Sequence, residues 1–436
     1  MILKADFQSV PFDPAEPRAA LAACPEQAAV FTLYGEAKHT EPYIGRTPNL
    51  RGRLERLLIP SPKHPRRLQL AGRVRQITWR RTGSDFESLL LQFDLVQNVY
   101  GPKALERMHL GAPSFVRFLG SNRYPRVTVT NRPSQREAEW AYGPFASRAA
   151  AERFAEEALK LFLLRRCTED LDPNPAHPGC VYSEMKMCLA PCYQGCTDER
   201  YAEESIAVER FLATRGESRL VQLKSSRDQA SANLEFETAA ALHAQVLKAE
   251  SVRALAPELV RPLNQLRAVV LQAAAEPDQV AVFLYDRGRL CGPGFFSTLG
   301  MRIQNEQSGS SSLYAQPLAL EPVPEDREQA TGNSQKEVID TGKDAPRDRD
   351  AARAARTMLE ARMESVVADL SAPVDPPDAT VRQGHLALLK RWYYRPEAKR
   401  PGEIFFPGEH GEWPIRALLR GAGRIAAKSL TGPAPS

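Results

Sequence analysis

Cysteine spacing constrains this chain more than any other feature of its sequence. Five of the seven cysteines lie between residues 167 and 196, and four follow the pattern Cys167-x12-Cys180-x7-Cys188-x3-Cys192. Closely spaced cysteines in an intracellular protein are usually metal ligands, and four thiolates suit either a tetrahedral zinc ion or a 4Fe–4S cluster. The segment DLDPNPAHPG (170–179) favours the turns that a loop around a metal needs. The spacing alone leaves zinc, iron–sulfur and unpaired buried thiols as alternatives.

The rest of the composition places the chain inside the cell. No run reaches 18 apolar residues, and the N-terminal MILKADFQSVPFDP lacks the long apolar run of a signal peptide. We therefore expect a cytoplasmic protein with no membrane partner. In a reducing compartment, the cysteines are not expected to form a disulfide framework.

Basic residues are concentrated near the N-terminus. The net charge is +5, but between Ile44 and Thr82 there are eleven Arg or Lys residues and one acid, Glu55. This is the segment where a polyanion such as DNA would bind.

The same region has the pattern of a compact α/β unit. Residues 29–34 and 42–45 are typical of paired strands, and 73–82 of a third strand. Thr47-Pro48 predicts the start of a helix with an apolar stripe, and 85–100 predicts a buried helix. Further along, 147–167 and 198–216 are expected to be helices, 217–255 a helical hairpin and 266–297 a β-rich patch. The hairpin's expected apolar face comprises Phe236, Ala239, Ala240, His243, Val246 and Leu247.

Three motifs occur in an order that resembles UvrC-type DNA excision-repair proteins: YIGRTPNLRGRL (43–54), the cysteine quartet, and NLEFETAAALHAQ (233–245). The first resembles the second half of the GIY-YIG nuclease signature. By this resemblance Tyr43 would activate water and Arg53 would steady the phosphate. Phe31 stands where the family has a second tyrosine, and Gln92 stands where it has the metal-binding glutamate.

These two replacements leave alternatives for the nuclease centre. Either it has decayed into a DNA-binding module that keeps its basic residues, Arg46, Arg51 and Arg56 among them, or a nearby acid replaces the lost ligand. Glu87 and Asp94 are the nearest candidates, but on a helix both point well away from Gln92. Mg²⁺ or Mn²⁺ is expected only if the nuclease is active.

The other two motifs imply a cofactor and a partner. Cysteines at nearly this spacing hold an iron–sulfur cluster in the family, so the resemblance favours a 4Fe–4S cluster on Cys167, Cys180, Cys188 and Cys192, with zinc as the alternative. The LEFE segment resembles the UVR motif, a helical hairpin that packs against a second such hairpin. It implies a UvrB-like helicase subunit as partner, bound through Leu234, Phe236, Ala240 and Leu242. The alternative is a hairpin that packs only on its own chain.

The expected fold is an α/β GIY-YIG-like domain followed by a mainly helical region, a small β patch, a linker and an α+β tail. Its predicted segments are 18–120 (GIY-YIG-like domain), 121–200 (connector and cysteine cluster), 201–255 (UVR hairpin), 256–300 (β patch), 301–350 (disordered linker) and 351–436 (C-terminal helix and aromatic tail). No segment resembles the RNase H-like and helix–hairpin–helix domains of full UvrC proteins. The sequence predicts a UvrC-like subunit that binds damaged double-stranded DNA. The alternatives are an active endonuclease cutting 3′ of a lesion, and a regulator that competes for the UvrB-like subunit.

Overall fold

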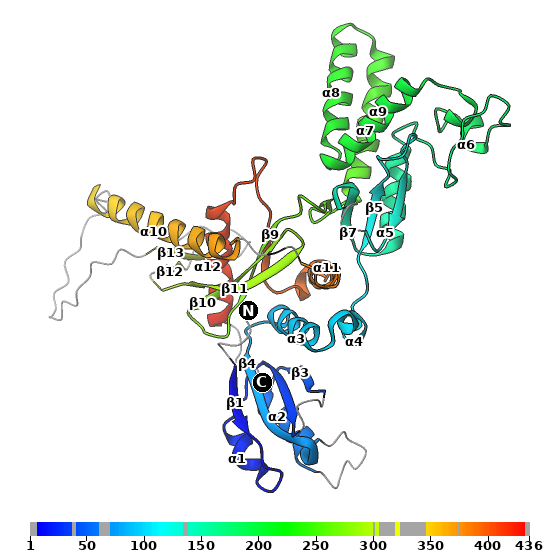
Figure 1. The fold of residues 1–436 in the computed structure, drawn as a ribbon. Helices are drawn as coiled ribbons and strands as arrows, with labels where there is room; N and C mark the ends of the chain where they lie inside the picture. Colours follow the sequence, from blue (N-terminus) through cyan, green and yellow to red (C-terminus); the bar gives the residue numbers. More distant parts are fainter. Residues whose placement is uncertain are drawn as a thin grey trace.

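The computed structural model describes residues 7–36, 41–60, 70–133, 138–299, 301–304, 319–322, 346–372, 375 and 377–431. Helices and antiparallel sheets alternate through the described residues, as the sequence predicts, and they gather into an N-terminal, a middle and a C-terminal lobe (Figure 1). Within the described residues, no helix is long and apolar enough to cross a membrane. Much of the expected linker, 301–350, lies outside the described residues. Two described pieces of it, β12 (Met301–Gln304) and β13 (Ala319–Pro322), pair with each other as antiparallel strands.

The N-terminal lobe is built on a four-stranded antiparallel sheet. Its strands lie in the order β1 (Gln8–Pro11), β4 (Val74–Arg81), β2 (Ala29–Gly35) and β3 (Tyr43–Thr47). One face packs on α1 (Pro17–Ala22) and α2 (Leu50–Leu58) through a core that includes Phe31, Leu54 and Trp79. The helix expected to begin at Thr47-Pro48 starts later, because the Asn49 side chain accepts from the Gly52 N–H and becomes the N-cap.

Helix α3 (Asp85–Tyr100) lies on the other side of this sheet and has the bounds that the sequence predicts. Ser84 caps its first turn by accepting from the Glu87 N–H, and Gly101, with φ of 54°, ends it. Successive β3 residues point to opposite faces, so Tyr43 joins the core with α2 while Ile44 packs towards α3. A short helix, α4 (Ala104–Arg107), follows.

The middle lobe joins a small sheet to a set of helices. The sheet order is β6 (Val127–Thr130), β5 (Ser114–Phe118), β7 (Ala141–Phe145) and β8 (Arg261–Pro262). Its core includes α5 (Arg148–Leu159) and α7 (Asp198–Ala213), and a long loop containing α6 (Val181–Glu184) carries the cysteines. The hairpin of α8 (Glu217–Ala232) and α9 (Phe236–Ala254) projects away from the N-terminal lobe (Figure 1).

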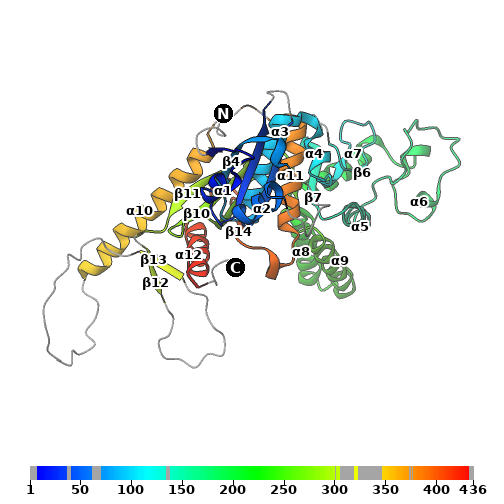
Figure 2. The same ribbon diagram turned by 90° about the horizontal axis from the view of Figure 1, so that it is seen from below.

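The C-terminal lobe unites segments that are far apart in sequence. Its sheet runs β11 (Arg289–Ser297), β10 (Gln279–Asp286), β9 (Ala268–Ala273) and β14 (Glu403–Phe405). Alternate side chains of β9 and β10 face α10 (Pro346–Leu370) and α12 (Ile415–Thr431) on one side (Figure 2). The others face α3 and α11 (Ala379–Tyr393). The β patch and the aromatic C-terminal segment therefore share one sheet.

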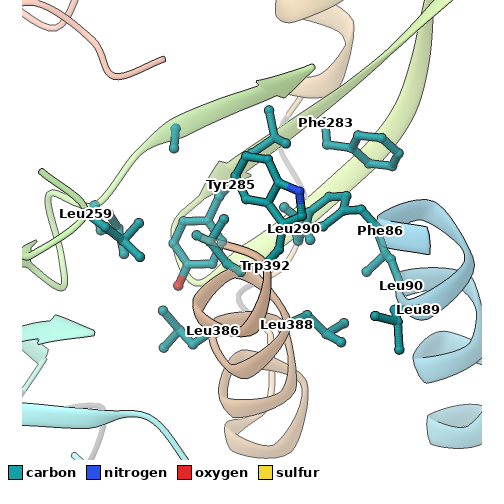
Figure 3. Close-up of a cluster of buried hydrophobic side chains, with 14 of the residues drawn as sticks. Phe86, Leu89, Leu90, Leu259, Phe283, Tyr285, Leu290, Leu386, Leu388 and Trp392 are labelled. Carbon is teal, nitrogen blue, oxygen red and sulfur yellow. The ribbon is translucent and has the colours of Figure 1, made fainter. Parts of the chain in front are cut away.

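Helix α3 couples the N-terminal lobe to this C-terminal sheet. Phe86, Leu89 and Leu90 of α3 meet Phe283 of β10 and Trp392 of α11 in one buried cluster (Figure 3). The Phe86 ring lies edge-on to both aromatic partners, at centroid distances of 5.1 Å from Phe283 and 5.5 Å from Trp392. Trp392 and its neighbours are thus packing residues, which favours packing over base stacking for this aromatic segment.

Candidate functional site

Tyr43 lies at the centre of the residues that resemble the nuclease signature. Its hydroxyl accepts a hydrogen bond from the Arg53 guanidinium at 3.3 Å, because β3 and α2 face each other across the N-terminal core. The Phe31 ring is fully buried beside it, with ring centroids 6.0 Å apart. A Cβ added at Gly45 would come within 2.7 Å of Phe31 Cζ, so glycine allows the Phe31 ring to lie over the strand. The fold therefore brings Tyr43, Arg53 and Phe31 together.

Gln92 of α3 lines a cavity together with the same tyrosine. Gln92, Tyr43 and Arg46 all line a cavity of about 560 Å³ beside β3. Within the described residues, the Gln92 amide has no hydrogen-bond partner in the protein. At this position the chain presents a neutral amide, with two N–H donors and a carbonyl acceptor.

The two acids that could replace a lost metal ligand point elsewhere. Glu87 is buried, accepts from the Gly83 N–H at 2.8 Å, and lies 3.9 Å from the Arg80 guanidinium. Burial raises its pKa, while the Gly83 N–H and the Arg80 charge oppose that rise. Asp94 is 3.4 Å from Nε2 of His385 on α11. Both carboxylates therefore have structural contacts away from Tyr43.

The three arginines expected to contact DNA differ in how far their guanidinium groups are already paired within the protein. Arg51 anchors the loop before β2, donating to the Cys24 carbonyl and to Glu26. Arg46 pairs with Asp85, which also accepts from Arg395 at 2.7 Å. Burial tends to raise the pKa of Asp85, but the Arg395 hydrogen bond and the Arg46 charge hold it below its usual value. The exposed Arg56 donates only to the Gly52 carbonyl of its own helix, so its charge is available to solvent.

The four cysteines of the quartet share one neighbourhood in the loop around α6. Burial, opposed by the Ala190 N–H, together with the charges of Cys167, Cys192 and Cys180, raises the pKa of Cys188 to about 11. The Ala190 N–H donates to Cys188 Sγ at 3.2 Å, and Ala190 itself has a left-handed φ of 56°. Within the described ranges, no three His, Cys, Asp or Glu side chains are close enough to form an assembled metal group. The donor set suits zinc or a 4Fe–4S cluster in number and type.

Arg165 is a residue near the quartet that the sequence analysis missed. It is 2% exposed and donates to the carbonyls of Tyr124 and Glu169, and to Cys167 Sγ at 3.4 Å. Its guanidinium thus ties the first cysteine to the loop between β5 and β6 of the middle lobe. Its position two residues before Cys167 was the only sequence signal, and charge alone does not distinguish it from the neighbouring Arg166.

The two helices of the hairpin pack against each other away from the turn that joins them, and the tip at that turn is exposed. Leu220, Leu223, Val246 and Ala249 form its core, and Leu242 packs against them half-buried. The ion pairs Lys224–Glu250 and Arg253–Glu217 link the two helices. At the tip Leu234 is 71% and Phe236 67% exposed, and Ala240 is also exposed. Of the four residues expected to bind a partner, Leu242 serves the hairpin's own core, while the other three face solvent.

Residues from the C-terminal segment also reach the N-terminal site. Arg391 of α11 lines the cavity with Tyr43 and Gln92, and Arg395 holds Asp85. Arg107 and His109, which follow α3, line the same cavity. No local sequence pattern connects these residues to Tyr43, because the packing of α11 on α3 joins positions some 300 residues apart.

The middle of the chain matches the model of a known protein family. Residues 115–211 match the family described as UvrC/Cho excinuclease, middle domain. This range contains β5 to β7, the cysteine loop and most of α7.

Longer matches are to proteins named UvrABC system protein C. The protein from Alcanivorax borkumensis is 29% identical over 238 residues, covering 55% of this chain and 39% of the relative. Those from Pseudomonas protegens and Pseudomonas aeruginosa PAO1 are each 28% identical, covering 54% and 52% of this chain and 38% and 37% of the relative. The matched part thus spans under two fifths of each relative's length. No solved structure matches the chain significantly.

Proposed function

We propose that this chain, whose resemblance to UvrC-type excinuclease subunits these matches confirm, is a DNA-binding subunit of a nucleotide-excision-repair incision complex. It binds damaged double-stranded DNA through the basic N-terminal lobe and is recruited by a UvrB-like helicase subunit through the hairpin. The exposed apolar tip of that hairpin is the observation that carries the proposal.

The hairpin tip has the properties of a docking surface. Leu234 and Phe236 are large apolar side chains that stay in water although a core forms a few turns away. Leu234 also has a left-handed φ of 62°, a conformation in which glycine or asparagine is far less strained than leucine. Burial of the Leu234 side chain in a complex would offset both the backbone strain and the exposure of an apolar group to water. A second helical hairpin with an apolar face is the partner that suits this geometry.

A paired substitution tests the recruitment step. Phe236→Asp should weaken binding to the UvrB-like subunit at least tenfold, since burying one Phe side chain contributes about 1.5–3 kcal/mol. The matched control is Leu247→Asp, which changes another exposed apolar residue of α9 about 16 Å further along the helix. Affinity measured by biolayer interferometry should fall only for the first variant. Equal binding of wild type and Phe236→Asp would remove the hairpin as the recruitment site.

The quartet is proposed to hold a 4Fe–4S cluster, with zinc as the alternative. Four thiolates with an N–H···S bond from Ala190 and a guanidinium near Cys167 form a suitable donor set. A bound cluster would close the loop of residues 167–192 and stabilise it by cross-linking. Anaerobically purified protein should show a visible absorbance band and about four iron atoms per chain. Stoichiometric zinc without that band would assign the site to zinc.

We propose that the GIY-YIG centre binds DNA without cutting it. Gln92 supplies a neutral amide where a divalent ion needs a carboxylate, and Glu87 and Asp94 are committed elsewhere. Incubation of the protein and its partners with damaged duplex DNA and Mg²⁺ or Mn²⁺ should give no nicks.

One observation favours the alternative, an active single-incision endonuclease that cuts 3′ of the lesion. Tyr43 and Arg53, which would activate water and steady the phosphate, lie side by side, with the Arg53 guanidinium donating to the Tyr43 hydroxyl. Metal-dependent nicking that disappears on Arg53→Ala would establish this activity. A regulator that competes for the UvrB-like subunit would also bind through the hairpin without nicking. A repair defect on deletion of the gene separates the accessory subunit from the regulator.

A further inference from the structure

The cavity beside Tyr43 is formed where three parts of the chain meet. Polar side chains of its lining come from β3 (Tyr43, Arg46), α3 (Gln92, Tyr100), α4 and the turn after it (Arg107, His109) and α11 (Arg391). Figure 1 places α3, α4 and α11 side by side, and the contacts between these helices agree. Its volume of about 560 Å³ lies within the range of small-molecule binding sites. The C-terminal segment is therefore part of the wall of this cavity.

The charges around the cavity favour an anion. Three arginines line it, and none of its lining residues is an aspartate or a glutamate. Arg107 pairs with Glu41 and stacks on the Tyr100 ring at 3.7 Å, while Arg46 and Arg395 share the single carboxylate of Asp85. Within the described part of the chain, Arg391 has no ion-pair partner. Counting these groups, four guanidinium charges face two carboxylates, so the surroundings are net positive.

Gln92 changes which ligand such a site can hold. A carboxylate accepts hydrogen bonds only, so it repels a phosphate unless a cation lies between them. The Gln92 amide can donate to a phosphate oxygen directly, and it has no competing partner among the described residues. The same substitution that removes a metal ligand thus creates a hydrogen-bond donor for the phosphate.

We infer that this cavity binds a nucleotide phosphate group without a metal ion, and that Arg391 of the C-terminal segment completes it. The inference rests on the proposed DNA-binding function and names where one phosphate sits. Arg391 is held in place by its neighbour Trp392, whose indole N–H donates to the Pro401 carbonyl at 3.0 Å. The phosphate can belong to a DNA strand or to a free nucleotide, since both present the same group to Arg391, Arg46 and Gln92.

The test measures phosphate-dependent binding by the full chain in EDTA. The probe is a fluorescent single-stranded oligonucleotide with a 5′-phosphate, compared with its 5′-hydroxyl counterpart and with a deoxynucleoside monophosphate as competitor. Arg391→Ala and Gln92→Glu should each weaken binding about tenfold, the size of one charge-assisted hydrogen bond. Arg391→Lys should recover part of the loss. Arg416→Ala is the matched control, because it removes an exposed arginine of α12, on the opposite face of the C-terminal sheet.

The outcomes separate the pocket from the wider function. Competition by the monophosphate assigns the pocket to a free nucleotide, and competition only by phosphorylated strands assigns it to DNA; both support the inference. It is overturned if EDTA abolishes wild-type binding, or if Arg391→Ala behaves like Arg416→Ala. If the inference fails but the protein still binds duplex DNA and is still recruited through the hairpin, the proposed function stands. If the protein binds no DNA but binds the monophosphate through Arg391, the proposed function fails and the pocket stands.

Discussion

Replacement of Trp392 should undock α11 from α3 and thereby test the contact between the N-terminal and C-terminal lobes. Its side chain is 2% exposed, lies edge-on to Phe86, and is covered by the Arg400 guanidinium 5.5 Å above the ring. Truncating a fully buried tryptophan to alanine costs about 3–5 kcal/mol of unfolding free energy. Trp392→Ala should lower the stability of the C-terminal lobe by that amount.

Trp392→Phe is the matched variant, and the structure fixes its smaller cost. The Pro401 carbonyl also accepts from the Gln272 side chain at 3.1 Å, so it keeps a partner when the indole N–H is lost. Trp392→Phe loses only the indole hydrogen bond, about 1 kcal/mol, and leaves a small cavity. We therefore expect its unfolding free energy to fall by about 1–2 kcal/mol.

The unfolding free energies of both variants are measured by urea denaturation monitored by far-UV circular dichroism. The alanine variant should also lose affinity for the phosphorylated oligonucleotide, since undocking α11 withdraws Arg391 from the cavity, while the phenylalanine variant keeps it. If both variants unfold within about 0.5 kcal/mol of wild type, α11 does not pack on α3 and the reasoning is refuted.

Three further predictions concern the N-terminal lobe and α3. Gly45→Ala should destabilise the lobe by about 1–3 kcal/mol in thermal unfolding, because the added Cβ would lie 2.7 Å from the buried Phe31 ring. The control Gly72→Ala should not change the melting temperature, because a Cβ at that position would have no atom within 4 Å. Glu87 has a raised folded-state pKa, so the native state holds its proton more tightly and the wild type loses stability as pH rises through that pKa. Glu87→Gln should therefore gain stability relative to wild type as the pH rises above the usual pKa of a glutamate carboxyl, and a difference in melting temperature that does not change with pH would contradict this. Cys24 is fully buried, and burial, opposed by Arg51, raises its pKa to about 11, so iodoacetamide at pH 8 should label it only after denaturation; labelling in the native state would show that the α1–α2 core opens.

Local elements of this fold are readable from sequence where their signals are local. The helix of residues 85–100 has a serine before it, a glycine after it and a continuous apolar pattern, and its bounds are confirmed. The start of α2 was misplaced because Thr47-Pro48 and Asn49 both offer capping groups, and only the backbone geometry selects the Asn49 side chain. Two adjacent cap signals cannot be ranked without the path of the preceding strand.

The hairpin shows how an alanine-rich helix weakens a periodicity argument. The expected apolar face ran from Phe236 through Ala239 and Val246, but of these only Val246 lies in the core, with Ala249 and Val252 continuing the buried side. Alanines occur all round α9, so the large apolar residues alone decide the pattern, and the largest of them, Phe236, lies at the exposed tip. The mismatch separates the residues that hold the hairpin from those left for a partner.

Gln92 illustrates why a site cannot be completed from a motif alone. Compared with a nuclease signature, it is a missing ligand, and its neighbours along α3 offer no replacement. Placed in three dimensions, it shares a cavity with Arg391, a residue from a segment that the motif does not include. The apolar face of α3 predicts burial but does not say against what, and the answer, α11 and β10, comes from the far end of the chain. The same docking that buries Trp392 places Arg391, a cation, in the lining of the cavity that also contains Gln92. In the proposed phosphate site the Gln92 amide and the Arg391 guanidinium act on the same phosphate group, so Arg391→Ala and Trp392→Ala should both weaken its binding, whereas Trp392→Phe should not.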